Sequence, residues 1–543
     1  PPAHERGGPV STVTRQFNLA DLFELVAAEV PDRLALVAGD ARLTYAELDA
    51  RTNRLARHFL DRGLQPGAKV AIYAWNRVEW VETFLAAFKA RLIPINVNYR
   101  YVAQELRYLF DNADAEVLVF ERSFAPTVAE ILPDLPTLTD LIVLEDGTDA
   151  DVGQATSYED VLAASSPEPL DLQRSADDYY FLYTGGTTGM PKGVMWRGED
   201  IFFAALSGFN PTPLDSPEAI TGRLLPDGVE VRSLIGAPIM HGAAQWGLLN
   251  ILYIGGTSVL YTGRGFDPVE VWKLAEAERC MGISLVGDAM ARPLADALAD
   301  PANSFDVSSV KTIGSGGAVL STAIKDQLRA LIPGLNVADS YGASETGANG
   351  TSSSGDDARR FTVSSETQVL GDDLRPVAPG SGIIGRVGRT GHIPQGYYKD
   401  EVKTAATFVT DPDGVRWVVP GDLGMVEADG TIQLLGRGSQ CINSGGEKIY
   451  PEEVEDALKG HPDVFDALVV GLPDDRFGER VAAVVAARPG TSPTLEELAA
   501  HCRQTMASYK VPRQLTLVDA VKRTPAGKAN YAWAKESALA DQA

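Results

Sequence analysis

The hydrophobic positions follow a helical period in some segments and a strand-like alternation in others. Leu48, Leu55 and Phe59 fall on one side of a helix that Thr44 and Glu47 would open as a capping box. A second helix is predicted at 79–90. Short apolar runs predict strands at 69–76, 116–120, 141–145, 282–287 and 310–317. Because helices and strands alternate, the fold class is α/β, with a large N-terminal body of several subdomains and a substantially parallel sheet.

The pattern changes character after Gly436. A charged helical segment at 450–461 is followed by strand-like runs at 466–471 and 480–487 and by a helix around 495–504. These elements predict a compact α+β unit of ordinary domain size at the C-terminus.

One stretch, residues 233–263, contains no charged residue and is long enough to raise the question of a membrane span. It contains Pro238, His241, Gln245 and Asn250 together with several glycines. This mixture favours a buried turn, helix and strand beside a ligand, so no transmembrane segment is expected.

Composition and charge narrow the classes of function. The 543 residues include 48 Lys and Arg against 73 Asp and Glu, a net charge of −25, with 45% hydrophobic residues. The balance is typical of a multi-layer globular enzyme. The acidic excess disfavours nucleic acid and anionic membranes as partners, so an anionic substrate needs locally placed donors.

The cysteines and the N-terminal residues bear on the compartment. Cys280, Cys441 and Cys502 are odd in number and form no CxxC pair, which argues against a disulfide framework and a zinc site. The first residues show no apolar signal-peptide core. We therefore expect a cytoplasmic protein.

The segment YTGGTTGMPKGV, residues 183–194, has the chemistry of a phosphate-binding loop that precedes a helix. Its glycines allow backbone N–H groups to turn toward an anion, its threonines add hydroxyl donors, and Lys192 adds a cation. The spacing differs from that of a Walker P-loop. A structural turn would be the alternative for a lone glycine-rich loop.

The chain resembles the adenylate-forming superfamily of acyl-CoA synthetases, carrier-loading adenylation domains and luciferases. Residues 183–193 are similar to its signature YTSGTTGxPKG, with Gly185 where serine is usual. Further blocks follow in the family's order: APIMHG (237–242), GSGGAVL (314–320), DSYGASETG (339–347), PGDLG (420–424), GRGSQCINSGGEKIYPEEVE (436–455) and KRTPAGKANY (522–531).

The resemblance implies an ATP-dependent acid:CoA ligase that forms an acyl-AMP, with ATP, Mg²⁺ and coenzyme A and a small carboxylic acid as substrate. The catalytic residues that it implies are Lys528, His241 and Glu345. Those for Mg²⁺ are Glu345 and Thr188, and those for the acid are His241, Gln245, Trp246 and Gly316. The residues that it implies for nucleotide and coenzyme A are Thr184, Gly185, Gly186, Thr187, Thr188, Lys192, Gly317, Ala318, Asp339, Tyr341, Gly342, Ser344, Asp422, Arg437, Gly445, Gly446 and Glu447.

The resemblance also implies a domain movement. The body would comprise residues 1–436, the hinge 437–439 and a small mobile domain 440–543, which carries Lys528. Such a lysine offsets the repulsion between a carboxylate and the α-phosphate. The hinge residue is Ser439, where the family usually has a charged residue, and Val319 replaces a common proline. Several blocks look most like the actinobacterial fatty-acyl-CoA synthetases associated with steroid side-chain acids.

Other interpretations stay open from the residues alone. His241 could be a core histidine, Glu345 part of a polar loop, and Asp422 with Arg437 a surface ion pair. A carrier-loading enzyme and a luciferase-like oxygenase share most of the blocks. Residues 342–346 nearly spell the Gly-x-Ser-x-Gly of a serine hydrolase but lack its last glycine. The acid itself and the oligomeric state, a homodimer included, are not given by the sequence.

Overall fold

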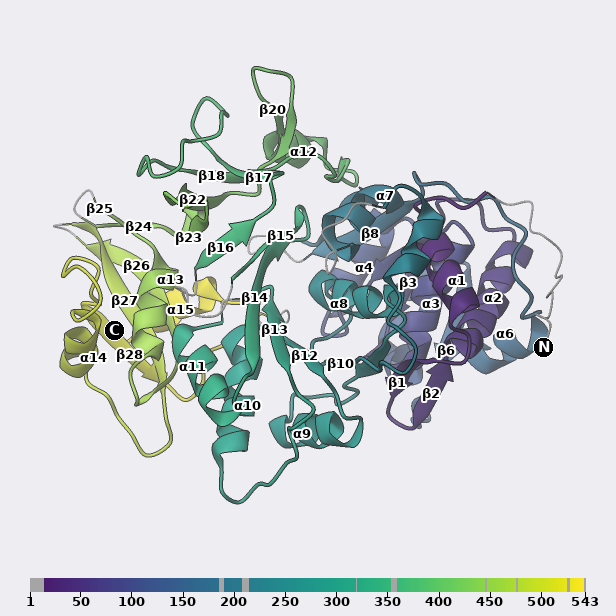
Figure 1. Ribbon diagram of the computed structural model, residues 1–543, viewed down its shortest axis with the longest axis horizontal. Coiled ribbons are helices and arrows are strands. Elements are labelled where there is room, and N and C mark those ends of the chain that lie inside the picture. Colours follow the sequence, from purple (N-terminus) through teal and green to yellow (C-terminus); the bar gives the residue numbers. More distant parts are fainter. Residues whose placement is uncertain are drawn as a thin grey trace. The chain divides into compact units, whose positions relative to one another are not determined.

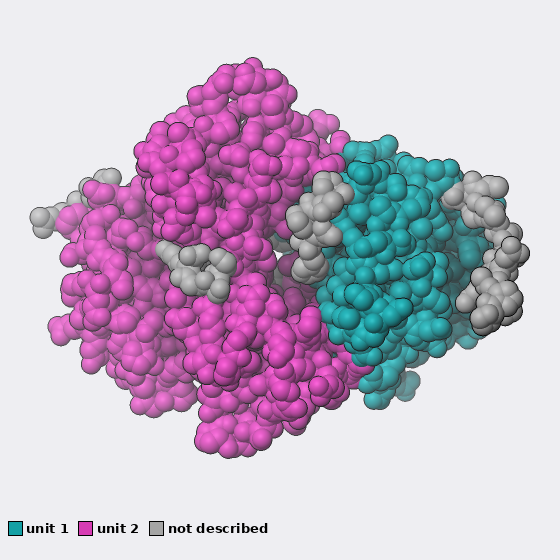
Figure 2. Space-filling model, in the orientation of Figure 1, with its two compact units in different colours: residues 1–185, 190–231, 245–262 teal, residues 186–189, 232–244, 263–543 magenta. Residues whose placement is uncertain are grey.

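The computed structural model describes residues 14–184, 190–207, 214–318, 320–352, 359–444, 447–474, 477–524 and 528–541. The chain forms two compact units, which Figure 2 shows in different colours. Unit 1 comprises residues 1–185, 190–231 and 245–262, and unit 2 comprises residues 186–189, 232–244 and 263–543.

Unit 1 is built on a five-stranded sheet in the order β4-β3-β5-β6-β7, whose strands are all parallel (Figure 1). Its strands are β3 (Lys69–Tyr73), β4 (Ile93–Asn96), β5 (Ala115–Glu121), β6 (Asp140–Leu144) and β7 (Thr156–Ser157). A separate group joins β1 (Leu34–Ala38) to β2 (Ala41–Thr44) and to β11 (Thr257–Leu260). The strands expected at 69–76, 116–120 and 141–145 are confirmed.

The helices of unit 1 before β8 are α1 (Leu19–Glu29), α2 (Tyr45–Asp61), α3 (Val78–Lys89), α4 (Ala103–Ala113), α5 (Ala125–Ile131) and α6 (Tyr158–Ala164). The predicted capping box is present at the start of α2: the Thr44 side chain accepts from the N–H of Glu47, and the Glu47 side chain accepts from the N–H of Thr44. Leu48, Leu55 and Phe59 are fully buried, as their spacing predicts.

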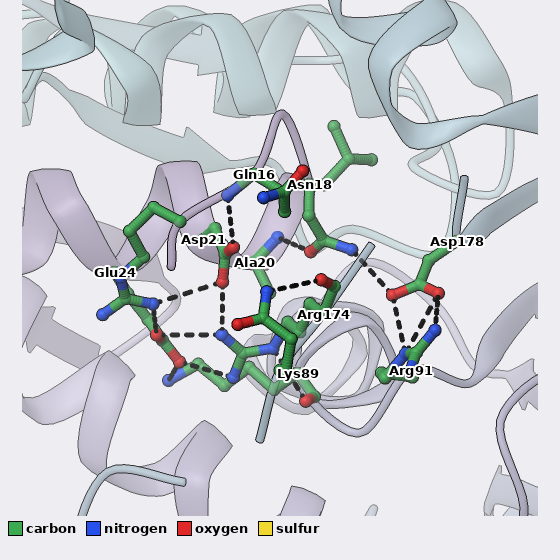
Figure 3. Close-up of polar contacts among 12 residues, drawn as sticks. Gln16, Asn18, Ala20, Asp21, Glu24, Lys89, Arg91, Arg174 and Asp178 are labelled. Carbon is green, nitrogen blue, oxygen red and sulfur yellow. Dashed lines mark hydrogen bonds and ion pairs between the residues drawn. The ribbon is translucent and has the colours of Figure 1, made fainter. Parts of the chain in front are cut away.

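A cluster of charged side chains lies inside unit 1 (Figure 3). Arg174 donates to Asp21 at 2.6 Å and to Glu24 at 2.8 Å, and Lys89 lies 3.6 Å from Glu24. Burial alone would raise the pKa of Glu24, but Lys89 and Arg174 outweigh it and lower that pKa to about 2. The cluster therefore ties α1 to α3 and to the segment that leads into β8 (Tyr179–Thr184).

The segment after the glycine- and threonine-rich loop differs from the prediction. A strand, β9 (Lys192–Arg197), follows the loop and pairs antiparallel with β8, so the expected helix at this point is wrong. The reason is visible in the alternation of KGVMWR, where Val194 and Trp196 are fully buried while Met195 and Arg197 are partly exposed. Short helical turns come only afterwards, as α7 (Gly198–Ile201) and a π-turn at Phe202–Leu206.

In unit 2, four neighbouring strands pair in parallel: β10 (Arg232–Ile235), β12 (Gly282–Leu285), β13 (Thr312–Gly316) and β14 (Asn336–Ala343). The helices between them are α9 (Pro268–Ala277), α10 (Gly287–Ala299) and α11 (Thr322–Leu331). Strands expected at 282–287 and 310–317 are thereby confirmed, and so is a substantially parallel arrangement in this part of the body.

The sheet of unit 2 continues antiparallel beyond β14. Its strands here are β15 (Gly347–Ser352), β16 (Arg360–Val363), β17 (Thr367–Leu370), β18 (Ile384–Arg389), β20 (Phe408–Thr410), β21 (Arg416–Val418), β22 (Asp422–Val426) and β23 (Ile432–Arg437). The same part of the chain also contains β19 (Gly396–Tyr397), which is not part of this sheet, and α12 (Glu401–Thr407). The pairing runs in the order β14-β15-β16-β23-β22-β18-β21-β20, with β17 also on β18.

The C-terminal residues of unit 2 form their own five-stranded sheet. Its elements are β24 (Ile442–Ser444), β25 (Glu447–Ile449), α13 (Pro451–Lys459), β26 (Val464–Asp474), β27 (Gly478–Ala487), α14 (Leu495–Cys502), β28 (Gln514–Val518) and α15 (Tyr531–Ala540). Ala467 and Val469 pack with residues of α13 and α14, whereas Leu468 and Val470 pack with residues of α15. Both faces are covered, which explains the continuous apolar runs in the sequence.

The uncharged stretch 233–263 forms a turn, a helix and a strand, as predicted. It contains most of β10, the helix α8 (Gly242–Tyr253) and β11. Within the part of the chain that the structure describes, none of the helices has the length and apolar character needed to cross a bilayer.

Candidate active site

The carboxyl ends of the parallel strands of unit 2 gather several of the predicted residues. His241 follows β10, the Gly317 turn follows β13, and Tyr341 lies near the end of β14. Gly317 has a φ of +83°, a left-handed conformation that favours glycine. In sheets of this type ligands bind beyond the carboxyl ends of the strands. Gly316 lies there as well, 3.9 Å from Ala243 if a Cβ is placed on it.

A tight turn between β14 and β15 carries Ser344 and Glu345. The N–H of Thr346 donates to the carbonyl of Ala343 at 3.0 Å, and the N–H of Ala343 donates to the Thr346 hydroxyl at 3.1 Å. A Cβ at Gly342 would come within 2.3 Å of the Gly347 carbonyl oxygen, so only glycine fits there. The turn thereby fixes the backbone on which Glu345 is presented.

Tyr341, Asp422 and Arg437 form a hydrogen-bonded group. Asp422 and Arg437 face each other across β22 and β23, and the Arg437 Nε lies 3.2 Å from Asp422. The Tyr341 hydroxyl donates to the other carboxylate oxygen at 3.0 Å. Burial, followed by the charge of Asp422, raises the pKa of Tyr341 far above its usual range. Each oxygen of Asp422 thus accepts a hydrogen bond, one from Arg437 and one from Tyr341.

Glu345 has a partner that the sequence did not suggest. The Tyr397 hydroxyl donates to the Glu345 carboxylate at 2.9 Å, and burial, with the charge of Glu345, raises the pKa of that phenol. Tyr397 lies 52 positions away along the chain, so no local spacing could have shown the contact.

The carboxylate of Glu345 is suited to bind a Mg²⁺ ion that is also held by phosphates. The described residues contain no group of three or more His, Cys, Asp or Glu side chains that could hold a metal ion. Mg²⁺ in such sites takes one or two carboxylates, with substrate phosphates and water as its other ligands. A single carboxylate oriented by Tyr397 matches that donor set.

Lys528 of the C-terminal domain is bonded to Thr524, and residues 525–527 between them lie outside the described residues. The N–H of Thr524 donates to the Lys528 carbonyl at 2.8 Å, and the N–H of Lys528 donates to the Thr524 hydroxyl at 3.1 Å. The neighbouring Arg523 is paired with Asp466 of β26 at 2.6 Å. The backbone of Lys528 is therefore tied to Thr524, and the adjacent Arg523 is tied to β26 of the same domain.

The environment of Lys528 joins the small domain to the group around Asp422. Burial and the charge of Arg437 lower the pKa of the Lys528 ammonium, while Glu345 and Asp422 act to raise it. The charge of the Lys528 ammonium is thus coupled electrostatically to a guanidinium and two carboxylates from distant parts of the sequence. Such a group can bind a substrate that carries both negative charges and hydroxyls.

The junction with the small domain is closely packed. Gly436 has a φ of +103°, and a Cβ there would lie 2.3 Å from Oε2 of Glu452, which belongs to α13. Burial, followed by the charge of Glu455, raises the pKa of Glu452 to about 7. Ser439 falls in a 3₁₀ turn at Gly438–Gln440, and its side chain is not among the described groups. Glu452 is a second residue that sequence reasoning missed.

The phosphate loop is described only at its ends. Thr184 and Lys192 are paired in the β8–β9 hairpin, one at each side of the loop. Gly185, Gly186, Thr187 and Thr188 lie outside the described residues. The roles predicted for all of them stay predictions.

Other predicted residues are buried, and their roles toward ligands stay predictions. Asp339 is buried, with its carboxylate 3.6 Å from Lys325, and burial raises its pKa to about 7. Gln245 is 1% exposed and accepts a hydrogen bond of 2.6 Å from the Tyr180 hydroxyl. Trp246 is also buried.

The last of the predicted residues are partly or wholly open to solvent. Ala318 is partly exposed in the turn after β13. Glu447 is exposed in the β24–β25 hairpin, where Gly445 and Gly446 lie outside the described residues. Their roles toward ligands stay predictions.

Comparison with known families gives two matches. Residues 23–398 match the model of the AMP-binding enzyme family, and residues 453–528 match that of the AMP-binding enzyme C-terminal domain.

Curated relatives match over nearly their full length. A protein of Mycobacterium marinum, named medium/long-chain-fatty-acid–CoA/3-oxocholest-4-en-26-oate–CoA ligase, is 48% identical, with 96% of each chain covered. A 3-oxocholest-4-en-26-oate–CoA ligase of Rhodococcus rhodochrous is also 48% identical over 96% of each chain.

Solved structures show the same fold. The anthranilate CoA ligase AuaEII in complex with anthranoyl-AMP superimposes with a TM-score of 0.83 at 23% identity, covering 98% of this chain and 99% of that one. ATP-bound MatB from Rhodopseudomonas palustris gives a TM-score of 0.80 at 25% identity, covering 96% of this chain and 98% of that one.

Proposed function

The chain belongs to the AMP-binding enzyme family, and on that premise we propose that it is an ATP-dependent acid:CoA ligase. It activates a carboxylic acid as an acyl-AMP with release of pyrophosphate, and then transfers the acyl group to the thiol of coenzyme A. The relatives that are named as CoA ligases and match over 96% of this chain support the thiol as acceptor. They do not favour the alternative, a free-standing enzyme that loads a carrier protein.

The observation that carries the proposal is the environment of Lys528. The charges of Glu345 and Asp422 favour its ammonium form, and the charge of Arg437 opposes it. A lysine in a desolvated site can bridge an acid carboxylate and the α-phosphate, where the attacking and leaving groups are both anionic. No general base is required, since the carboxylate is already ionised at neutral pH.

We assign the other nucleotide contacts in the same way. Asp422 accepts from the ribose hydroxyls and exchanges its present donors for them, and Tyr341 lies beside the adenine. Arg437 contacts ribose or phosphate. Thr184 and Lys192 bind the polyphosphate, with Lys192 on the pyrophosphate that leaves.

Mg²⁺ is the expected metal, and Glu345 is its carboxylate ligand. When bound, the ion neutralises charge that develops on the leaving pyrophosphate. The Glu345→Gln variant keeps the side-chain shape and the Tyr397 contact but loses the anionic ligand. Pyrophosphate release by this variant should need about tenfold more Mg²⁺ or more, in keeping with a lost metal ligand. An Mg²⁺ dependence equal to that of the wild type would contradict the assignment.

The small domain, residues 440–543, is proposed to rotate about residues 437–439 between the two half-reactions. Lys528 serves the first step. The β24–β25 hairpin, in which Glu447 begins β25, faces coenzyme A in the second step. One placement of the domain can hardly serve both steps. The Ser439→Pro variant should therefore lose thioester formation more than adenylation.

The acid is proposed to be hydrophobic, either a medium or long fatty acid or a steroid side-chain acid. The names of the relatives support both classes. The uncharged stretch 233–263, with His241 at its first turn and Trp246 on α8, supplies apolar surface for such a group. Each methylene that is buried contributes about 0.8 kcal/mol, so a two-carbon acid gains little.

A pyrophosphate-release screen tests the function. Acetate, octanoate, palmitate and 3-oxocholest-4-en-26-oate are each supplied with ATP and Mg²⁺, with and without coenzyme A. We expect AMP and a thioester to form with the hydrophobic acids and with coenzyme A only. Acetate turned over at or above the efficiency of octanoate would overturn the choice of acid, and acyl-AMP without any thioester would favour carrier loading.

Conditions in the cell follow from the same chemistry. Cys280 and Cys502 are buried and Cys441 is partly exposed, and all of them are free thiols, as the sequence predicts. Free thiols and the use of ATP and coenzyme A support a reducing cytoplasm as the place of action.

A further inference from the structure

The end of β8, where the phosphate loop begins, is held by a side chain from another sheet. Asn96 is the last residue of β4, is 8% exposed, and lies beside β8 within unit 1. Its Nδ2 donates to the carbonyl of Tyr183 at 2.9 Å, and its Oδ1 accepts from the N–H of Tyr183 at 2.8 Å. One amide thus satisfies both backbone groups of a single residue, as a neighbouring strand would do.

The side chain of Tyr183 is fixed as well. Its hydroxyl donates to Asn112 Oδ1 of α4 at 2.8 Å, and the residue is 5% exposed. A Cβ placed on Gly193 would lie 2.8 Å from the Tyr183 ring, so the ring rests directly on the glycine of the facing strand. The contact therefore reaches both strands of the hairpin.

These contacts lie next to the two described residues that flank the loop. Tyr183 precedes Thr184 and Gly193 follows Lys192, and in the hairpin Tyr183 is paired with Gly193 and Thr184 with Lys192. Any shift of Tyr183 along or across β8 would move the Thr184 hydroxyl and the Lys192 ammonium together. Displacements of about 1 Å in groups that bind reacting phosphates cost up to about a hundredfold in rate.

We propose that Asn96 is a positioning residue that, through the backbone and ring of Tyr183, sets Thr184 and Lys192 for the β- and γ-phosphates of ATP. This rests on the proposed function, in which Thr184 and Lys192 bind polyphosphate. Asn96 itself touches no substrate in this scheme. Its amide is matched to a pair of backbone groups, so neither leucine nor aspartate can replace both hydrogen bonds.

A matched pair of variants separates this role from plain stability. Asn96→Leu removes both hydrogen bonds at nearly constant volume. Asn53→Leu is the control, because Asn53 is also a buried asparagine of unit 1, bonded to Lys89 and to the Pro167 carbonyl, and has no contact with β8 among those described. Both substitutions should lower the melting temperature.

Equilibrium binding of ATP and of AMP to the full-length chain gives the decisive measurement. Asn96→Leu should weaken ATP binding about tenfold or more and leave AMP binding within about twofold, because AMP lacks the phosphates that the loop would hold. Gly193→Ala, which must push the Tyr183 ring aside, should do the same. Asn53→Leu should leave both affinities unchanged.

Two results would overturn the proposal. One is an equal loss of ATP and AMP binding in Asn96→Leu, which would indicate general damage to the fold. The other is unchanged ATP binding and an unchanged KM for ATP in Asn96→Leu, with only the melting temperature lowered. A failure of the proposed function looks different: the wild type would bind ATP with the same dependence on Asn96 and release no pyrophosphate with any acid.

Discussion

Two buried arginines show how differently charge is treated in two regions of the molecule. Arg174 in unit 1 is 2% exposed, and Arg292 on α10 of unit 2 is 3% exposed. Arg174 uses all of its nitrogens, on Asp21, on Glu24 and on the carbonyl of Lys89. Arg292 has one long hydrogen bond of 3.5 Å to the carbonyl of Lys459 and a cation–π contact with Phe465, and its Nε has no hydrogen-bond partner among the described residues.

The pKa values follow this difference. Burial lowers the pKa of both guanidinium groups, but Glu24 and Asp21 outweigh it for Arg174, whose pKa is raised, whereas that of Arg292 is lowered. Among the carboxylates, Glu24 has its pKa lowered to about 2, while that of Glu452 on α13 is raised to about 7. Arg174 therefore belongs to a complete ion network, whereas the charges of Arg292 and Glu452 are only partly compensated. Ion pairs do occur beside Arg292, where Arg488 lies 3.1 Å from Asp296 and Lys459 lies 3.6 Å from Asp288 of α10.

The contrast fits the different tasks of the two regions. A complete buried network is costly to open, because each charge that loses its partner stays in an apolar environment. Contacts in which charges are only partly compensated lose little when they separate and regain water. Arg292 and Glu452 are groups of this second kind, which is compatible with the proposed rotation of the small domain.

Breaking the complete network should have the largest effect. Arg174→Met leaves Asp21 and Glu24 without their main partner and should cost about 3–5 kcal/mol of unfolding free energy. Arg107→Met is the control, since Arg107 pairs with Glu130 and Asp134 at the surface and should cost about 1 kcal/mol or less. Urea unfolding followed by fluorescence measures both, and equal losses would refute the contrast.

Removing the ammonium of Lys528 should lower the rate of adenylation more than the stability of the fold. Lys528→Ala should reduce acyl-AMP formation by about a hundredfold to a thousandfold, the range for a lost transition-state contact. Conversion of prepared acyl-AMP and coenzyme A to thioester should be kept. Lys535→Ala, an exposed lysine of the same domain, is the control. If both half-reactions of Lys528→Ala fell equally, with circular dichroism unchanged, Lys528 would not be specific to adenylation.

Glu452 should make the stability of the wild type depend on pH. Its pKa is about 7 in the folded chain and 4.5 ordinarily, so its carboxyl stabilises the folded chain fully below pH 4.5, and that contribution is lost as pH rises through 7. Glu452→Gln should therefore be about 1–3 kcal/mol more stable than the wild type above pH 7 and equal to it near pH 4. Thermal unfolding at both pH values measures the difference, and a gain that is the same at both would rule out titration of Glu452 as its cause.

The smallest effect on stability is expected for Arg292→Met, the substitution in unit 2 that corresponds to Arg174→Met in unit 1. Arg292→Met replaces a buried arginine that has few hydrogen bonds with an apolar side chain, and the unfolding free energy should change by less than about 1 kcal/mol. The same urea experiment applies. A loss as large as that of Arg174→Met would show that Arg292 is fully paired in solution.

Local patterns in the sequence predicted the elements well where period and capping agree. Thr44 with Glu47 gave the start of α2, and the apolar runs at 466–471 and 480–487 gave β26 and β27. The strand β9 was mistaken for a helix because loops rich in glycine and threonine often precede helices, while the alternation of Val194 and Trp196 is short.

The candidate site was predictable only in part. Resemblance in motif order supplied Glu345, Asp422, Arg437 and Lys528, which the structure brings together. Tyr397, Glu452 and Asn96 carry no motif, and their importance comes from contacts that only the folded chain creates.

The attachment of Lys528 to the small domain bears on the direction of the reaction. Hydrogen bonds to Thr524 and the ion pair of Arg523 with Asp466 tie its backbone to the small domain, so in the proposed rotation Lys528 would move with that domain away from the nucleotide. Attack of pyrophosphate on the acyl-AMP, which regenerates ATP, passes through the same transition state as adenylation and needs the same cation. Under the proposed rotation, pyrophosphate that remains bound would lack the cation it needs to convert the acyl-AMP back to ATP, and the acyl group would pass to the thiol of coenzyme A.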